Sequence, residues 1–184
     1  MLKLELEIKL RVRDRPRLDA LLPALGARLL HPRELEDNQL YDFPDRSLET
    51  ARRMLRLRRL GRGSVLTLKE SPRIEQGAKA RDEMEVMVQE AEILAAILGR
   101  LGLVPLFRYQ KYRTTYGYRD LFITIDETPI GSFLELEGPK PLIDEMAGRL
   151  GYEASDYILE TYRDLYTEHA RTTGKSPDSM LFDP

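Results

Sequence analysis

The sequence contains no cysteine and only two histidines, His31 and His169, which lie far apart in the chain. The absence of cysteine excludes disulfides and thiolate chemistry, and it fits a reducing, cytoplasmic location. With so few histidines, neither a histidine-rich metal site nor a Ser-His-Asp triad is expected. Any chemistry must therefore depend on carboxylates, Lys, Arg, Tyr or a bound ion.

Long apolar runs and an excess of either charge are also absent. No stretch approaches the length of a membrane span, and no secretory signal is visible. The net charge is −2, from 29 Lys and Arg and 31 Asp and Glu, so neither nucleic acid nor a membrane is expected as a partner. The 184 residues suit one domain, which we place at residues 1–170, with a tail at 171–184 that we expect to be loose.

What the chain does contain is a repeated alternation of charged and apolar residues. Residues 3–13 read KLELEIKLRVR, with a charge at every odd position and Leu, Ile or Val at every even position. This period of two predicts a β-strand with one charged and one apolar face. The same design recurs in six later segments: 54–60, 64–70, 81–88, 106–118, 121–127 and 132–138. With the first strand and an extended stretch at 28–43, this makes about eight strands.

The strands follow one another mostly through short loops, which favours antiparallel pairing. One possible architecture is an antiparallel sheet with a wet, charged face. The other is a closed barrel with the charges in its lumen and amphipathic helices at 14–25, 90–101, 140–150 and 156–169 packed outside. The bases are mainly Arg, and the carboxylates form i, i+2 pairs on three strands, which favours the barrel.

A lumen lined by both acidic and basic side chains would favour particular ligands. Oxygen ligands without Cys or suitable His suit Mg²⁺ or Mn²⁺. Arg and Lys match phosphate oxygens. Acids and bases together therefore predict a complex of a divalent ion with a polyphosphate.

The ordered motifs resemble those of the CYTH superfamily, also called triphosphate tunnel metalloenzymes. ELEIK at 5–9 has the form ExExK, and it is followed by LRLRR, LTLKE, RDEMEV, KYR and ITIDETPIGSFLELEG, so the resemblance covers roughly residues 1–140. It implies an α+β fold, an eight-stranded antiparallel tunnel with helices outside. The segment around Asp42 reads YDF where the family often has YFDT, which leaves a role for Asp42 open.

The resemblance also implies roles for individual residues. Glu5, Glu7 and Lys9 of the ExExK motif would be catalytic. The implied metal ligands are Glu5, Glu7, Glu83, Glu85, Asp126, Glu135 and Glu137. The implied triphosphate-binding residues are Lys9, Arg56, Arg58, Lys69, Lys111 and Arg113. We expect three tyrosines near the C-terminus only to pack: Tyr157, Tyr162 and Tyr166.

The expected function is metal-dependent hydrolysis of a small triphosphate, such as inorganic tripolyphosphate, thiamine triphosphate or a nucleoside triphosphate. A class IV adenylyl cyclase, which makes cyclic AMP from ATP, needs the same positioning of phosphates and is the alternative. A polyphosphate-binding module without catalysis is the third possibility. The residues leave open whether the protein is a monomer or a homodimer.

Overall fold

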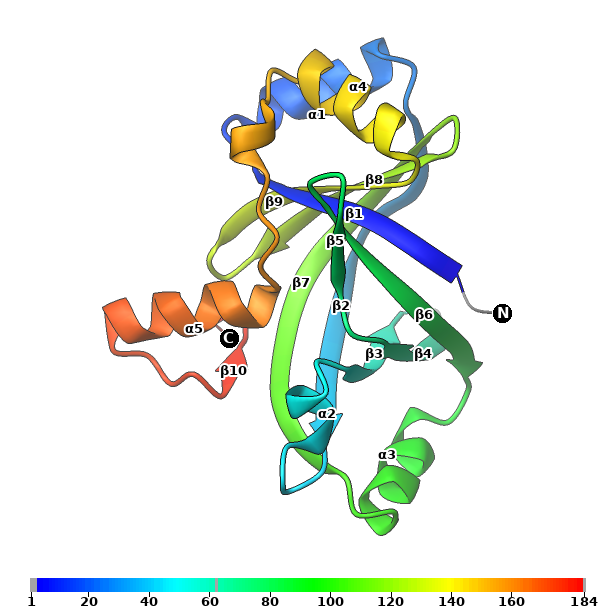
Figure 1. Ribbon diagram of the computed structural model, residues 1–184, viewed down its shortest axis with the longest axis vertical. Coiled ribbons are helices and arrows are strands. Elements are labelled where there is room, and N and C mark those ends of the chain that lie inside the picture. The colour runs from blue at the N-terminus through cyan, green and yellow to red at the C-terminus, as the bar shows by residue number, and fades with distance from the viewer. Residues whose placement is uncertain (1–2, 62, 184) are drawn as a thin grey trace.

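A computed structural model describes residues 3–61 and 63–183, with side chains from residue 6 onward. Within this part of the chain, eight antiparallel strands close into a barrel in the order β1-β9-β8-β7-β2-β3-β4-β6, and β6 pairs back onto β1 (Figure 1). Their bounds are β1 (Lys3–Arg11), β2 (Arg28–Asp42), β3 (Met54–Leu60), β4 (Gly63–Lys69), β6 (Ala78–Val88), β7 (Val104–Tyr118), β8 (Leu121–Thr128) and β9 (Gly131–Glu137). The predicted eight-stranded tunnel is thus confirmed.

Two short strands extend the barrel. β5 (Arg73–Glu75) pairs with β6, and β10 (Ser179–Met180) pairs in parallel with β7. The sequence analysis assigns no strand to residues 71–80, but this segment contains β5 and the start of β6. The side chain of Met180 is fully buried, so this part of the C-terminal tail packs on the barrel.

The apolar faces of the strands point outward and are covered by helices, as the alternation predicts. Leu22 of α1 (Arg15–Ala24) and Ile143 of α4 (Lys140–Arg149) belong to one buried cluster with Ile8 and Ile125 of the barrel. Figure 1 shows these two helices side by side above β1, β8 and β9. Leu98 of α3 (Ala91–Arg100) covers Leu57 on the outside of β3.

The last predicted helix, 156–169, is wrong in its first part. Residues Ala154–Asp156 form one 3₁₀ turn, and α5 begins only at Tyr162 and runs to Thr173. Between them the chain is extended, because Ile158 exchanges two backbone hydrogen bonds with Lys9 of β1, at 2.8 and 3.3 Å. Thr161 then begins α5 through a capping box with Asp164. We call residues 157–161 the strap.

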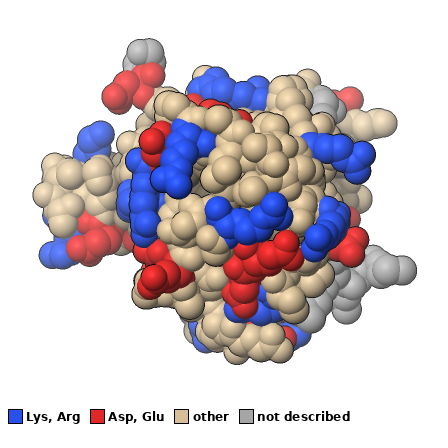
Figure 2. Space-filling model, turned by 90° about the horizontal axis from the view of Figure 1, so that it is seen from above, with Lys and Arg blue, Asp and Glu red and all other residues tan. Residues whose placement is uncertain are grey.

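The outer surface carries mixed charges. Seen from above α1 and α4, Lys and Arg side chains alternate with Asp and Glu side chains over the visible face (Figure 2). Many are paired, for example Glu127 with Arg15 at 3.0 Å and with Arg33 at 3.1 Å, and such exposed pairs contribute little to stability. Within the described residues, no helix has the length and apolar character needed to cross a lipid bilayer.

Candidate functional site: a charged tunnel

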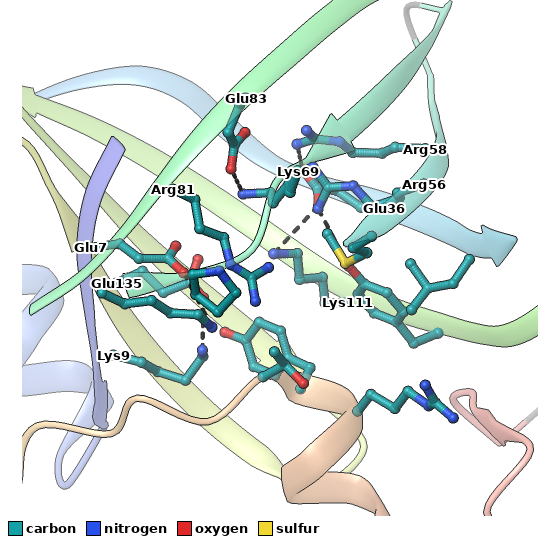
Figure 3. Close-up of a pocket in the computed structure, with 18 of the residues that line it drawn as sticks. Glu7, Lys9, Glu36, Arg56, Arg58, Lys69, Arg81, Glu83, Lys111 and Glu135 are labelled. Carbon is teal, nitrogen blue, oxygen red and sulfur yellow. Dashed lines mark hydrogen bonds and ion pairs between the residues drawn. The ribbon is translucent and has the colours of Figure 1, made fainter. Parts of the chain in front are cut away.

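The lumen of the barrel is a cavity of about 740 Å³ lined mainly by ionised side chains (Figure 3). Among the described residues, eleven Lys and Arg and nine Asp and Glu line it. The cavity therefore has a small excess of positive charge, although the whole chain has a net charge of −2. The predicted site residues that line the cavity are Glu7, Lys9, Arg56, Arg58, Lys69, Glu83, Glu85, Lys111, Arg113, Glu135 and Glu137.

Strand register explains how residues far apart in sequence meet here. On adjacent β1 and β9, Lys9 lies opposite Glu135, and Glu7 lies opposite Glu137. Side chains directly opposite on one face of an antiparallel pair are close neighbours. Lys9 Nζ accordingly lies 3.3 Å from a carboxylate oxygen of Glu135, and the two point toward each other in Figure 3. Lys69 and Glu83, opposite on β4 and β6, form a second ion pair.

Asp126 lies directly opposite Arg113 on neighbouring strands β8 and β7, but it is not among the residues that line the cavity. It is completely buried, and its carboxylate accepts hydrogen bonds from Lys111 Nζ at 2.8 Å and from Arg113 Nε and Nη2, both at 2.6 Å. Asp126, then Glu36 and Glu135, raise the pKa of Arg113 well above its usual value, although burial opposes this. In this arrangement Asp126 holds two bases in place; its direct contact with a metal stays a prediction.

Glu36 belongs to the site but was missed from the sequence. It is 3% exposed and lies 3.2 Å from Arg58 and 3.5 Å from Lys111. Burial alone would raise its pKa, but Lys111, Arg113 and Arg58 lower the pKa of Glu36 well below its usual range. The alternation of Glu34, Glu36 and Asn38 within residues 28–43 was the available signal.

The cations on β3 are crowded. First the neighbouring Arg56 and then burial lower the pKa of Arg58, despite the nearby Glu36 and Glu85. The Nε atoms of Arg56 and Arg58 are buried and have no hydrogen-bond partner among the described residues. Buried donors without acceptors are unfavourable, so this wall is suited to a ligand rich in acceptor oxygens.

Lys79 is a second residue that the sequence analysis missed, because the predicted strand begins only at residue 81, whereas β6 begins at Ala78. It is 5% exposed, lines the cavity and lies 3.8 Å from Glu7. Burial, together with the charges of Arg81 and Lys9, lowers the pKa of Lys79 to about 8, although Glu7 opposes this. Extending the alternation of β6 back from Glu83 through Arg81 would have found it.

The Asp42 carboxylate has a structural role. It accepts hydrogen bonds from the backbone N–H groups of Phe43, Leu48 and Glu49, at 2.7–2.9 Å. These bonds hold the short helix α2 (Ser47–Thr50) at one mouth of the cavity. Asp42 thereby positions the loop that carries Arg52 and Arg53, which line that mouth.

Tyr162 was expected only to pack, but its hydroxyl also enters the polar network. It is 7% exposed, and its hydroxyl donates a hydrogen bond of 2.7 Å to Asp126. The ammonium groups of Lys9 and Lys111 lie 4.5 and 5.1 Å from its ring centre. Burial, and then Asp126 and Glu135, raise the pKa of Tyr162 well above its usual value, so the hydroxyl stays protonated as a donor.

We expect Tyr162→Phe to lower the free energy of unfolding by about 1.5–3 kcal/mol, because a hydrogen bond to a buried carboxylate is lost. Tyr166→Phe is the matched control: Tyr166 is 6% exposed in the same helix and packs on Phe107. Urea unfolding followed by circular dichroism measures both variants. Equal stability of the two variants would show that the Tyr162 hydroxyl contributes nothing.

The carboxylates of the lumen are mostly separated by bases. Among the described residues, no three Asp, Glu or His side chains come close enough to form a metal cage. Glu7 and Glu137 lie opposite each other on β1 and β9 and both line the cavity, and Glu7 also lies 3.8 Å from Lys79. The side chain of Glu5, the other carboxylate of the ExExK motif, lies outside the described residues.

The fold and the lumen define a class: closed eight-stranded tunnels with ionised side chains inside. The chain belongs to the CYTH domain family, whose model matches residues 3–166. This confirms the resemblance inferred from the motifs, and the match extends beyond residue 140 to include the strap and the start of α5.

Individual relatives agree with this assignment. One relative is a Methanocaldococcus jannaschii protein named "Putative adenylate cyclase", which is 28% identical to this chain over 135 residues. The aligned region covers 73% of this chain and 76% of that protein. A solved Pyrococcus horikoshii structure is similar at 25% identity and a TM-score of 0.71, covering 90% of this chain and 99% of that one. A Hippeastrum protein, described as a "putative adenylyl cyclase" with a dominant triphosphatase activity, shares the fold with a TM-score of 0.64 and 19% identity. The alignment covers 96% of this chain and 97% of that protein.

Proposed function

We propose that the protein is a divalent-metal-dependent phosphohydrolase that binds a small triphosphate inside the tunnel. The observation that carries this proposal is the gathering of cations from five strands around one cavity, with buried guanidinium donors that lack acceptors. A triphosphate supplies both the negative charge and the oxygen acceptors. The triphosphate-binding residues in this proposal are Lys9, Arg56, Arg58, Lys69, Lys79, Lys111 and Arg113.

The bases are held in position before the ligand arrives. Asp126 accepts hydrogen bonds from Lys111 and Arg113, and Glu36 lies 3.2 Å from Arg58. Side chains that are already ordered lose little conformational entropy on binding. The planar guanidinium groups can each engage two phosphate oxygens, and the ammonium groups neutralise the remaining charge.

The donor set of the lumen fits Mg²⁺ or Mn²⁺ in a particular way. Mg²⁺ is usually held by one or two carboxylates together with substrate phosphates, so an all-protein cage is not needed. Glu7 and Glu137, with like charges directly opposite each other, are the pair that a cation would stabilise most. When bound there, the ion would neutralise charge on the phosphate oxygens; the metal roles of Glu5, Glu83, Glu85, Asp126 and Glu135 remain predictions.

Hydrolysis requires a base and neutralisation of the leaving group. In the proposed step, Glu7 accepts a proton from a water molecule while the water oxygen attacks the terminal phosphorus. The bond from that phosphorus to the bridging oxygen breaks, and the electron pair stays on the departing diphosphate. Lys9 and Arg113 would neutralise this charge as it develops.

Hydrolysis is favoured over cyclisation on chemical grounds. Water is always present, whereas cyclisation requires a ribose 3′-hydroxyl to be held in line with the α-phosphorus. The dominant triphosphatase activity described for the Hippeastrum protein supports the same choice.

A product assay tests the proposal. The protein is incubated in the presence of Mg²⁺ or Mn²⁺ with one substrate at a time: tripolyphosphate, thiamine triphosphate or ATP. The products are then separated by ion-exchange chromatography. We expect orthophosphate from at least one substrate and none after chelation of the metal. Cyclic AMP and pyrophosphate from ATP would instead indicate a cyclase. Tight binding without any product would indicate a polyphosphate-binding module.

A further inference from the structure

The helix α3 carries more apolar residues than its packing against the barrel uses. Leu94 and Leu98 belong to the same packed cluster as Leu57 of β3, so this side of the helix faces the barrel. Ile93 and Ile97 are nonetheless 58% and 49% exposed. Figure 1 shows α3 at the lower end of the molecule, well separated from α1, α4 and α5, so none of these helices covers the two isoleucines. Single exposed apolar residues are ordinary, but neighbouring ones on one side of a helix mark an interaction surface.

The two isoleucines belong to an ordered row on the exposed side of α3. Residues three or four positions apart are neighbours on the surface of a helix. Four exposed residues follow one another at this spacing: Glu90, Ile93, Ile97 and Arg100. We call these four residues the α3 stripe. It has an acid at the start of the helix, two isoleucines in the middle and a base at the end.

The α3 stripe is complementary to a reversed copy of itself. Ala95 lies midway between Ile93 and Ile97 in the sequence, and also midway between Glu90 and Arg100. When two α3 helices lie antiparallel around a two-fold axis level with Ala95, Ile93 of each copy faces Ile97 of the other. In the same arrangement Glu90 of each copy faces Arg100 of the other. A two-fold interface requires this property, because the same patch of both copies must fit itself.

Both charges of the α3 stripe are available for contacts with a second chain. Among the described residues, neither the Glu90 carboxylate nor the Arg100 guanidinium has a hydrogen-bond or ion-pair partner. Glu92 of the same helix, in contrast, lies 2.9 Å from Arg59 of β3. The stripe therefore has an apolar middle between two unpaired charges, which matches the apolar core and polar rim of protein interfaces.

The outer face of β6 enlarges the apolar surface beside α3. Val86 and Met84 alternate with the carboxylates that line the cavity, so they point outward, and they are 55% and 41% exposed. Leu66 of β4 lies opposite Val86 and packs in the same cluster as Leu94, which connects this strand face to the helix. Leu101, which directly follows α3, is 66% exposed. With the two isoleucines, these residues present on the order of 500 Å² of apolar surface, a large part of the roughly 800 Å² that each partner buries in a stable complex.

We propose that two copies of this chain form a homodimer through antiparallel α3 helices, with the two-fold axis level with Ala95. A lipid surface or an unrelated protein would give no reason for charges of opposite sign at equal distances from the middle of the stripe. A second copy accounts for both the exposed isoleucines and the placement of Glu90 and Arg100. None of the four residues of the stripe lines the cavity, so the dimer is independent of the proposed function.

Charge reversal tests this pairing directly. Glu90→Arg places like charges opposite each other at both ends of the interface, and so does Arg100→Glu. In sedimentation equilibrium of the full chain, we expect a dimer for the unmodified protein and a dissociation constant about tenfold higher or more for each single variant. The double variant with both changes restores two pairs of opposite charge, so its dissociation constant should lie within about threefold of the original value. An equimolar mixture of the two single variants should form a heterodimer, because each chain carries the charges that the other lacks.

Replacement of an isoleucine tests the apolar middle of the α3 stripe. Ile97→Lys should raise the dissociation constant at least about 100-fold, because it places a charge in the core of the interface. Ile74→Lys is the matched control: Ile74 is 59% exposed on β5, outside the stripe, so the dissociation constant should change less than about twofold. Both residues are exposed, and circular dichroism checks that the variants retain the fold.

Several results would overturn the inference. An unmodified protein that stays monomeric at millimolar concentration would leave the α3 stripe to a different partner. A dimer that Ile97→Lys leaves intact would use another surface. A double charge variant no tighter than the single variants, or a mixture of single variants that stays monomeric, would contradict the antiparallel two-fold arrangement, since that arrangement requires both recoveries.

Discussion

Replacing Asp126 by alanine is expected to lower the free energy of unfolding by about 3–5 kcal/mol, because it leaves buried cations without their partner. Lys111 is 2% exposed, and both it and Arg113 donate to the Asp126 carboxylate. The Tyr162 hydroxyl loses its acceptor in the same variant. For a chain of this size, the thermal midpoint should fall by roughly 6–20 °C.

The neighbouring residue provides the control for Asp126. Glu127 lies on the same strand, and its ion pairs with Arg15 and Arg33 are partly exposed to solvent. Glu127→Ala should therefore lower the free energy of unfolding by at most about 1 kcal/mol. Asp126→Asn keeps the shape of the side chain and removes its charge. Its free energy of unfolding should lie between those of the two alanine variants. Calorimetric melting distinguishes them, and an Asp126→Ala midpoint equal to that of Glu127→Ala would refute the idea that Asp126 holds the cations in place.

Replacing Glu7 by glutamine is expected to reduce turnover by about 10²–10⁴-fold, the range for loss of a positioned acid or base. Glutamine has nearly the same shape but cannot accept a proton from water or carry negative charge. The fold should be retained, since the change also removes a negative charge from the position opposite Glu137 on β9. Initial rates of phosphate release across a range of Mg²⁺ concentrations measure the effect.

An exposed carboxylate outside the cavity serves as the comparison for Glu7. Glu90 precedes α3 without capping it through its side chain, so Glu90→Gln should have normal turnover. Binding of tripolyphosphate to Glu7→Gln should persist, because the bases of the lumen remain. Full turnover in Glu7→Gln would show that neither the catalytic nor the metal role belongs to this residue.

The strap and α5 show how the tunnel is completed by parts of the chain far from the motifs. Lys9 Nζ donates a hydrogen bond of 3.1 Å to the backbone carbonyl of Glu160, while its backbone pairs with Ile158. The same lysine forms the ion pair with Glu135. The C-terminal segment thus orders a base of the ExExK motif, and this segment lies within the family match, which runs to residue 166.

Several site residues could be predicted because strand periodicity directly reports which face a side chain occupies. Glu83 and Glu85, or Glu135 and Glu137, alternate with apolar residues and must share a face wherever the strand lies. Glu36 and Lys79 follow the same rule and were missed only because their segments were not divided into faces. Tyr162 had no comparable signal, since the turn to α5 depends on the pairing of Ile158 with Lys9.

By itself, the sequence determined the charged and apolar faces of the strands, the near absence of His and Cys ligands and, through its ordered motifs, the family. These are local properties, because alternation depends only on neighbouring positions in the chain. Only the tertiary structure decided that Asp126 is completely buried opposite Arg113 and that Glu7 faces Glu137. Those contacts join strands distant in sequence, and closure of the barrel sets their register.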